Sequence, residues 1–217
     1  LAKVVAVAEP REAYRAAFAK TFSIAPEMQF ETWEAFVEKR RDVDAVIVTT
    51  MDRDHVGPAV ASLDYGYHLL LEKPVAPSLE ECRQIETVAA GSKSITAVCH
   101  SLRYQKGFRK LKEVVDEGRI GRIITLDHVE QVAWWHQAHS YVRGNWRRED
   151  ESAFMLLAKS CHDLDYISYL VDQPCREVSS FGELTWFRPE HAPVGAGQRC
   201  TDCCLEPTCP YSAVRFY

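Results

Sequence analysis

The first hundred residues alternate between short apolar runs and segments with helical periodicity. The apolar runs have the length of β-strands and cover residues 3–8, 44–50, 67–71 and 94–99. Between and after them, apolar residues recur at helical spacing at residues 10–22, 32–40, 54–65 and 78–90. Apolar strands separated by helices predict an α/β domain with a Rossmann-type doubly wound parallel sheet, which we place at residues 1–101.

Turn and capping residues support two of these boundaries. Gly66 follows the helix at residues 54–65, where a helix C-cap favours glycine. Ser78 begins the helix at residues 78–90 and has Glu81 three positions later, which is the pattern of a capping box.

The pattern changes after residue 101. Helical segments are predicted at residues 104–117 and 152–171, and strand-like segments at residues 122–135 and 176–187. The alternation at residues 122–135 is typical of an antiparallel strand. Residues 102–217 therefore predict a second, α+β domain with a mainly antiparallel open sheet.

The composition and charge of the chain limit the kinds of partner and cell compartment that we expect. The chain has 217 residues, 47% hydrophobic content and a net charge of −5, and no basic stripe that would indicate nucleic-acid binding. No stretch reaches the roughly 18 apolar residues of a membrane span. The first residues do not have the pattern of a signal peptide. The chain also lacks an initiator Met, so we expect it to begin inside a longer protein. Its eight cysteines are too few and too uneven for a disulfide framework, which favours a reducing cytoplasm.

The tripeptide Glu72-Lys73-Pro74 follows the apolar run at residues 67–71. In open α/β sheets, ligands bind at the carboxyl ends of the strands. A partly desolvated lysine at this edge can act in proton transfer. Taken alone, the tripeptide could equally be an ordinary ion pair at a strand end.

Acidic and hydroxyl residues follow two other strands. Glu9 has the place of an acid that hydrogen-bonds the adenosine ribose, although the Gly-rich turn would lie about 20 residues earlier. We therefore expect the first strand and its turn to be missing. Arg11 could meet a 2′-phosphate, whereas Glu9 favours NAD over NADP. Thr49 and Thr50 would let a cofactor approach the backbone, and helix capping is the alternative reading of this segment.

An ordered series of motifs resembles the Gfo/Idh/MocA oxidoreductase family, the relatives of glucose–fructose oxidoreductase and inositol dehydrogenase. The series is Val46-Ile47-Val48-Thr49-Thr50, His55, Gly66-Tyr67-His68, Glu72-Lys73-Pro74, His100-Ser101-Leu102-Arg103-Tyr104 and Gly118-Arg119-Ile120-Gly121. The resemblance implies NAD or NADP bound to the first domain, and a second domain that supports substrate binding and often dimerisation. It also implies hydride transfer between the nicotinamide and a sugar or polyol carbinol.

The family's second signature, D-x-G-x-H-x-x-D, is matched at His162 and Asp165 but not at Ala158 and Ser160. Either His162 and Lys73 share the proton transfer, or Lys159 has taken a role, or the chemistry differs. A structural histidine paired with Asp165 is the simpler reading of His162. The resemblance implies Lys73, His162 and Lys159 as candidate catalytic residues. The candidate cofactor-binding residues are Glu9, Arg11, Thr49, Thr50, His55, Glu72, Lys73 and Arg103.

Residues 136–150 are rich in aromatic and polar side chains, a combination that suits a sugar. We name His139, Trp146 and His162 as candidate substrate contacts, with a surface or interface loop as the alternative.

A cysteine cluster, Cys200, Cys203, Cys204 and Cys209, lies near the end of the chain. Closely spaced thiols can bind zinc, but the side chains of adjacent cysteines diverge, and His191 or a residue beyond the chain would have to complete the site. We expect reduced thiols in a packed loop and no metal.

The resulting expectation is an NAD(P)-dependent oxidoreductase acting on CH–OH groups of a small molecule, as a homo-oligomer without nucleic-acid or membrane partners. The alternatives are an NAD-dependent glycoside hydrolase of the same superfamily and a non-catalytic, dinucleotide-sensing regulatory protein.

Overall fold

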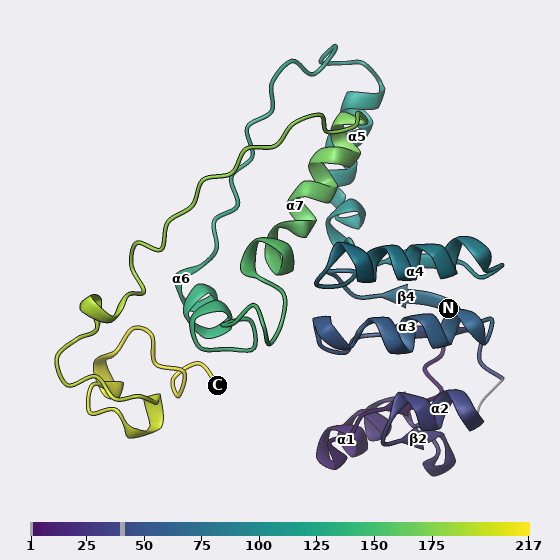
Figure 1. Ribbon diagram of the computed structural model, residues 1–217, viewed down its shortest axis with the longest axis horizontal. Coiled ribbons are helices and arrows are strands. Elements are labelled where there is room, and N and C mark those ends of the chain that lie inside the picture. Colours follow the sequence, from purple (N-terminus) through teal and green to yellow (C-terminus); the bar gives the residue numbers. More distant parts are fainter. Residues whose placement is uncertain (1, 40–41) are drawn as a thin grey trace. The chain divides into compact units, whose positions relative to one another are not determined.

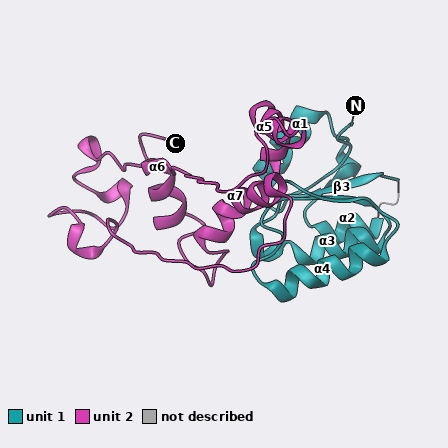
Figure 2. Ribbon diagram, turned by 90° about the horizontal axis from the view of Figure 1, so that it is seen from above, with its two compact units in different colours: residues 1–99 teal, residues 100–217 magenta. Residues whose placement is uncertain are grey.

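The computed structural model describes residues 2–39 and 42–217. The chain divides into two compact units, Leu1–Cys99 and His100–Tyr217 (Figure 2). Each unit is described by itself below.

Unit 1 contains two parallel sheets. Strand β1 (Val7–Ala8) pairs with β2 (Gln29–Phe30), and β3 (Ala45–Val48), β4 (His68–Leu71) and β5 (Thr96–Val98) form a second sheet in the order β3-β4-β5. The doubly wound order 3-2-1-4-5-6 places the first strand between the second and the fourth. If β1 to β5 correspond to the second to sixth strands of that order, the pairings β1-β2 and β3-β4-β5 are those expected on either side of its first strand. The predicted parallel sheet is confirmed, and no strand joins β1 to β3 within the described residues.

The strands of unit 1 are connected by helices, as the apolar pattern predicts. These are α1 (Glu12–Phe22), α2 (Trp33–Lys39), α3 (Val56–Asp64) and α4 (Leu79–Gly91), with short helical turns at Pro26–Met28 and Asp52–Asp54. Arg40, the last residue of one predicted helix, lies outside the described residues. The capping box of Ser78 and Glu81 is confirmed, and Gly66 after α3 has a φ of 84° that favours glycine.

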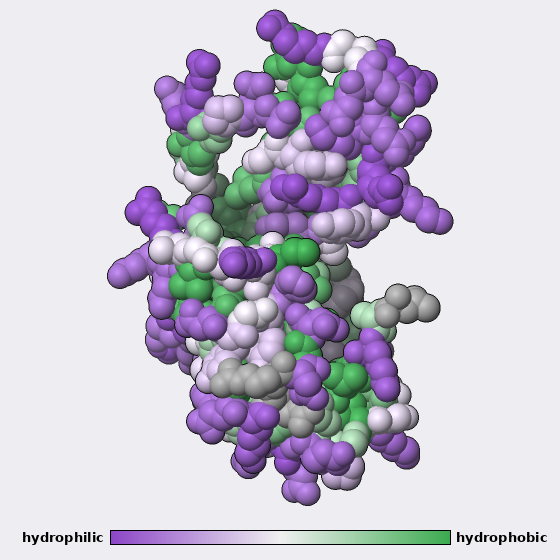
Figure 3. All heavy atoms as spheres, turned by 90° about the vertical axis from the view of Figure 1, so that its right-hand side faces the viewer, coloured by the Kyte–Doolittle hydropathy of each residue, from purple (hydrophilic) through white to green (hydrophobic). Residues whose placement is uncertain are grey.

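Helices α3 and α4 lie alongside β4 (Figure 1) and build the main core of unit 1 with the inward side chains of the sheet. This core includes Val48, Leu69, Leu71, Leu63 and Ile85. The burial of β3 is one-sided, because Val48 is 3% exposed whereas Ile47 is 61% exposed. Figure 3 shows hydrophobic residues in patches within a mainly hydrophilic surface.

Unit 2 is built on two helices. A short turn at Ser101–Tyr104 leads into α5 (Lys106–Asp116), and the longest helix is α7 (Met155–Val171). The ring of Phe108 lies 4.5 Å from that of Tyr166, whose hydroxyl donates to the Phe108 carbonyl at 3.1 Å. This contact packs α5 against α7.

The remainder of unit 2 consists of short helical turns and extended segments. The turns are α6 (Trp134–His136), a π-helical turn at Gln137–Val142, and 3-10 turns at Pro189–His191, Cys200–Asp202 and Glu206–Thr208.

The strands predicted at residues 122–135 and 176–187 are not formed in the described part of unit 2. Residues 122–133 and 176–185 have no regular secondary structure. Their apolar side chains, such as Val129 and Phe181, are 79% and 97% exposed. A strand is stable only with paired neighbours and a covered face, and these segments have neither here.

No helix in the described residues is long and apolar enough to span a bilayer.

Candidate functional site

The turn at Glu72-Lys73-Pro74 is fixed by its backbone at the end of β4. The backbone N–H of Glu72 donates to Val48 O at 2.9 Å, and Cys99 N donates to Leu71 O at 2.8 Å. The carboxylate of Glu72 accepts a 3.0 Å bond from the backbone N–H of Lys73. The Lys73–Pro74 bond is cis, Pro74 is buried, and Lys73 is half-buried. The amine of Lys73 is thus carried on a well-determined backbone at the carboxyl edge of the sheet.

The buried ring of His55 contacts the backbone of this turn. His55 is 1% exposed, its Nδ1 lies 2.9 Å from Pro74 O, and its Nε2 lies 3.2 Å from Thr50 O. The ring therefore joins the loop after β3 to the turn after β4. The sequence placed His55 against the cofactor. The ring is almost fully buried and lies against these two carbonyls, and a contact of His55 with the cofactor stays a prediction.

Cys99 is a neighbour of this turn. It directly follows β5 and is half-buried. Burial raises the pKa of the Cys99 thiol, and a hydrogen bond to Glu72 raises it further. Its position at the end of the apolar run at residues 94–99 was the available signal for its place at the edge.

Glu9 and Arg11 form a close pair after β1. Arg11 donates from Nε and Nη2 to the two carboxylate oxygens of Glu9, at 2.7 and 2.9 Å. The backbone N–H of Arg11 adds a third bond at 2.9 Å. The Arg11 guanidinium lowers the pKa of Glu9 to about 2. Glu9 therefore remains an acceptor at all ordinary pH values, but a ribose hydroxyl would have to share it with Arg11.

Thr49 and Thr50 follow β3 and are both exposed. Thr50 Oγ1 donates to Asp54 O at 3.0 Å, which makes it part of the turn into α3. A contact of these two residues with the cofactor stays a prediction.

In unit 2, the segment His100–Tyr104 is bound to α7 through Asp165. Arg103 donates from Nε and Nη2 to the two oxygens of Asp165, each at 2.7 Å. The guanidinium also lies 4.5 Å above the ring of Tyr169. Asp165 thus pairs with Arg103. The sequence placed Arg103 against the cofactor, and this contact stays a prediction.

His162 stands one turn before Asp165 on α7. Its ring meets that of His100 edge-on, with centroids 5.9 Å apart, and His100 Nε2 lies 3.8 Å from Asp165 Oδ1. Burial lowers the pKa of His100, and the charge of Asp165 opposes this shift only in part. The arrangement keeps His100 neutral beside His162. His100 was not among the predicted site residues, although it begins the segment that contains Arg103.

Two of the other predicted residues have structural contacts. Lys159 Nζ lies 2.6 Å from Glu130 Oε1, so its amine is held in an ion pair, and its catalytic role stays a prediction. His139 is 9% exposed and lies against Phe216 with its Nε2 3.2 Å from Tyr211 O, and its contact with a substrate stays a prediction. Trp146 is half-buried beside Tyr141.

Comparison with known proteins gives a consistent family assignment. Residues 1–100 match the model described as "Oxidoreductase family, NAD-binding Rossmann fold", and residues 108–198 match "GFO/IDH/MocA C-terminal domain". The YteT protein of Bacillus subtilis is 29% identical over 184 residues, which is 82% of this chain and 43% of YteT. The 1,5-anhydro-D-fructose reductase of Ensifer adhaerens is 30% identical over 64% of this chain and 41% of its own length.

Solved structures show the same fold. The crystal structure of myo-inositol 2-dehydrogenase from Lactobacillus plantarum superimposes with a TM-score of 0.66 at 18% identity, covering 79% of this chain and 49% of that one. The chain thus spans less than half the length of the relatives it matches.

Proposed function

The chain belongs to the Gfo/Idh/MocA oxidoreductase family, and from this premise we propose that the protein transfers a hydride between NAD(P) and a CH–OH group of a sugar or polyol. The observation that carries the proposal is the place of Lys73. It follows β4 at the carboxyl edge of a parallel sheet, on a turn fixed by Glu72 and the buried His55.

Lys73 serves as the acid–base group of this reaction. Oxidation of a carbinol releases a proton together with the hydride, and the nicotinamide accepts the hydride when the cofactor is bound. The Lys73 amine takes the hydroxyl proton and returns it in the reverse direction. His162 binds the substrate hydroxyls, and its neutral neighbour His100 supports its ring.

The dinucleotide is held by residues at the strand ends of unit 1. Glu9 would accept a hydrogen bond from the adenosine ribose, and the exposed residues Thr49 and Thr50 would lie beside the cofactor. The negative charge of Glu9 favours NAD, while Arg11 would receive the 2′-phosphate of NADP. Glu72 orients the Lys73 backbone.

The substrate is a small molecule, and the protein acts as a homo-oligomer. All eight cysteines are free thiols, which supports a reducing, cytoplasmic location.

The test is a turnover assay of the protein with NAD or NADP and a panel of sugars and polyols. Reduced nicotinamide should accumulate in proportion to product. Product without reduced nicotinamide would instead indicate a redox-neutral reaction such as glycoside hydrolysis, and dinucleotide binding without any product would indicate a sensing protein.

A further inference from the structure

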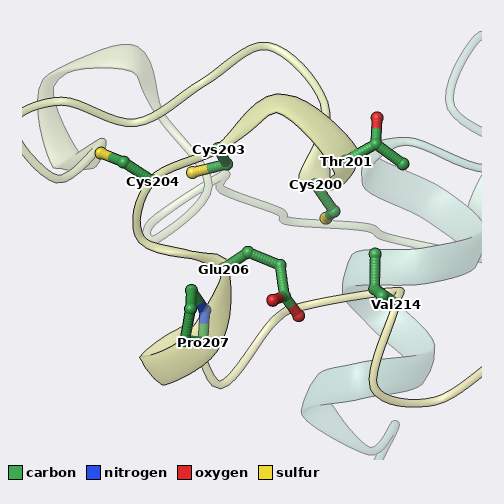
Figure 4. Close-up of a pocket in the computed structure, with 7 residues that line it drawn as sticks. All are labelled: Cys200, Thr201, Cys203, Cys204, Glu206, Pro207 and Val214. Carbon is green, nitrogen blue, oxygen red and sulfur yellow. The ribbon is translucent and has the colours of Figure 1, made fainter.

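The cysteine cluster near the end of the chain is not gathered around a common centre. Cys200, Cys203, Cys204 and Glu206 line an open hollow of about 410 Å³, in which the sulfur of Cys204 lies on the far side of Cys203 from that of Cys200 (Figure 4). The carboxylate of Glu206 accepts from Ser212 Oγ at 2.6 Å. In the part of the chain that the structure describes, no cysteine belongs to a group of three or more possible ligand atoms within 4.8 Å. This segment therefore carries no metal assignment.

A closer group of charged side chains lies between helix α7 and the extended segment before α6. His128 Nε2 donates to Asp163 Oδ1 at 2.8 Å. Lys159 Nζ lies 2.6 Å from Glu130 Oε1. Because side chains alternate along an extended segment, His128 and Glu130 point to one side and Val129 to the other, where it is 79% exposed. Charged side chains, and not burial of Val129, thus attach this stretch to α7.

The two carboxylates of this group depend on their basic neighbours. One possible ligand atom each of His128, Glu130 and Asp163 lies within 4.8 Å of the others. Carboxylates this close repel each other unless a cation or a donor lies beside them. Asp163 is also 7% exposed, where an unpaired charge would be costly. Loss of the Lys159 amine should therefore weaken the whole contact with α7.

The contact lies beside His162 on the helix. Lys159 and Asp163 are four residues apart and share one face of α7. At about 100° per residue, His162 lies about 60° around the helix from Lys159 on one side and about 60° from Asp165 on the other. Asp165 is bound by Arg103, at 2.7 Å for each of its oxygens. The helix is thus held on both sides of His162, and it cannot rotate without breaking one of these contacts.

We propose that His128 and Glu130 are positioning residues, which fix the rotation of α7 through Asp163 and Lys159 and so direct the ring of His162 toward the substrate. The inference rests on the proposed function, because it takes His162 as the group that binds the substrate hydroxyls. It also assigns Lys159 to an ion pair, from which it acts through the helix and not on the substrate itself.

The first experiment measures kcat and KM of Glu130→Gln, Lys159→Met and the charge exchange Glu130→Lys with Lys159→Glu. Each single variant breaks the same ion pair, so both should raise KM several-fold with kcat nearly unchanged, which is the signature of weakened uniform binding. The exchange restores opposite charges and should recover most of the loss. Glu113→Gln breaks the exposed 2.9 Å pair with Lys110 on α5 and is the matched control, with KM expected to equal that of the wild type.

Two kinetic results would overturn the proposal. A large fall in kcat for Lys159→Met, with Glu130→Gln like the wild type, would show that the lysine acts on the reacting atoms. An equal increase of KM in Glu113→Gln would show a general effect of charge and not a contact with α7.

The second experiment follows the ring of His162 by NMR and needs no turnover. Its imidazole C–H resonance is assigned by its loss in His162→Gln. A turned ring changes its place beside the ring of His100, which it meets edge-on at 5.9 Å, so the resonance should shift in Glu130→Gln and not in Glu113→Gln. A wild type without turnover would count against the proposed function alone, and this resonance would still decide whether Glu130 positions His162. An unmoved resonance in folded Glu130→Gln would contradict the proposal.

Discussion

The imidazole of His55 bonds the carbonyl oxygen of Pro74 at 2.9 Å, across 19 residues of sequence, and so fixes the turn that carries Lys73. Lys73 is half-buried at the sheet edge, whereas His55, which fixes its turn, is 1% exposed. This relation makes the position of Lys73 sensitive to the buried His55.

His55 can be tested by comparing two substitutions. His55→Leu leaves the carbonyls of Pro74 and Thr50 without their partner, which should cost about 1–3 kcal/mol of unfolding free energy. Turnover should fall by about 10²-fold, because small displacements of a catalytic group are costly. His55→Gln keeps a donor and should recover part of both losses. Denaturant unfolding and kcat would show this, and equal behaviour of the two variants would contradict a hydrogen-bonding role.

Glu9 and Arg11 give a prediction about pH and cofactor choice. Arg11→Ala should raise the pKa of Glu9 from about 2 toward its ordinary value of 4.5. Because the folded pKa is lowered, the pair stabilises the fold above pH 4.5, and this contribution is lost as pH falls toward 2. It should be small and weakened by salt, since the pair is exposed. An NMR titration of the Glu9 carboxyl measures the shift.

The same variant should change cofactor preference. Arg11→Ala removes the cation proposed for the 2′-phosphate, so NADP affinity should fall several-fold while NAD affinity holds or rises. An equal effect on both cofactors, measured by calorimetry, would show that Arg11 does not meet the 2′-phosphate.

Asp165 should stabilise unit 2 through Arg103. Asp165→Asn breaks a bidentate pair that is only partly exposed, and we expect a loss of about 1–3 kcal/mol in unfolding free energy. Asp163→Asn is the matched control on the same helix, because it disturbs His128 and leaves the Arg103 pair intact. Thermal and denaturant unfolding of both variants test this. If Asp163→Asn lowered the unfolding free energy and Asp165→Asn did not, the Arg103 pair would not be what stabilises unit 2.

His100 should make unit 2 sensitive to acid. Its pKa is lowered from 6.5 by burial, so the unfolded chain binds its proton more readily than the folded one. Stability from this group is therefore complete above pH 6.5 and declines as pH falls through the folded pKa. In His100→Gln the slope of unfolding free energy below pH 6.5 should be shallower. An unchanged slope would exclude His100 as its source.

Local signals in the sequence predicted the local structure well. The capping box at Ser78 and the glycine after α3 were visible because they depend on neighbouring residues alone. The parallel strands followed from apolar runs between helices. The exposure of Ile47 was not predictable, because burial of a strand face depends on which elements cover it.

The sequence motifs identified the residues of the candidate site, but they did not show which residues contact one another. The residues Lys73, His55, Arg103 and Asp165 were all identified from sequence, yet their partners are distant along the chain. Arg103 meets Asp165 across 62 residues, and spacing alone favoured His162 as the partner of Asp165. The strands expected at residues 122–135 and 176–187 depended on pairing partners, which an alternating pattern cannot supply.

The most direct test of the account is the turnover of Lys73→Met, measured beside its affinity for NAD. Methionine keeps the length of the side chain and removes the amine. Loss of the acid–base group should lower kcat by about 10²–10⁴-fold, with folding intact and NAD affinity within a few-fold of wild type. Turnover that equals wild type would contradict the role of Lys73 and, with it, the proposed mechanism.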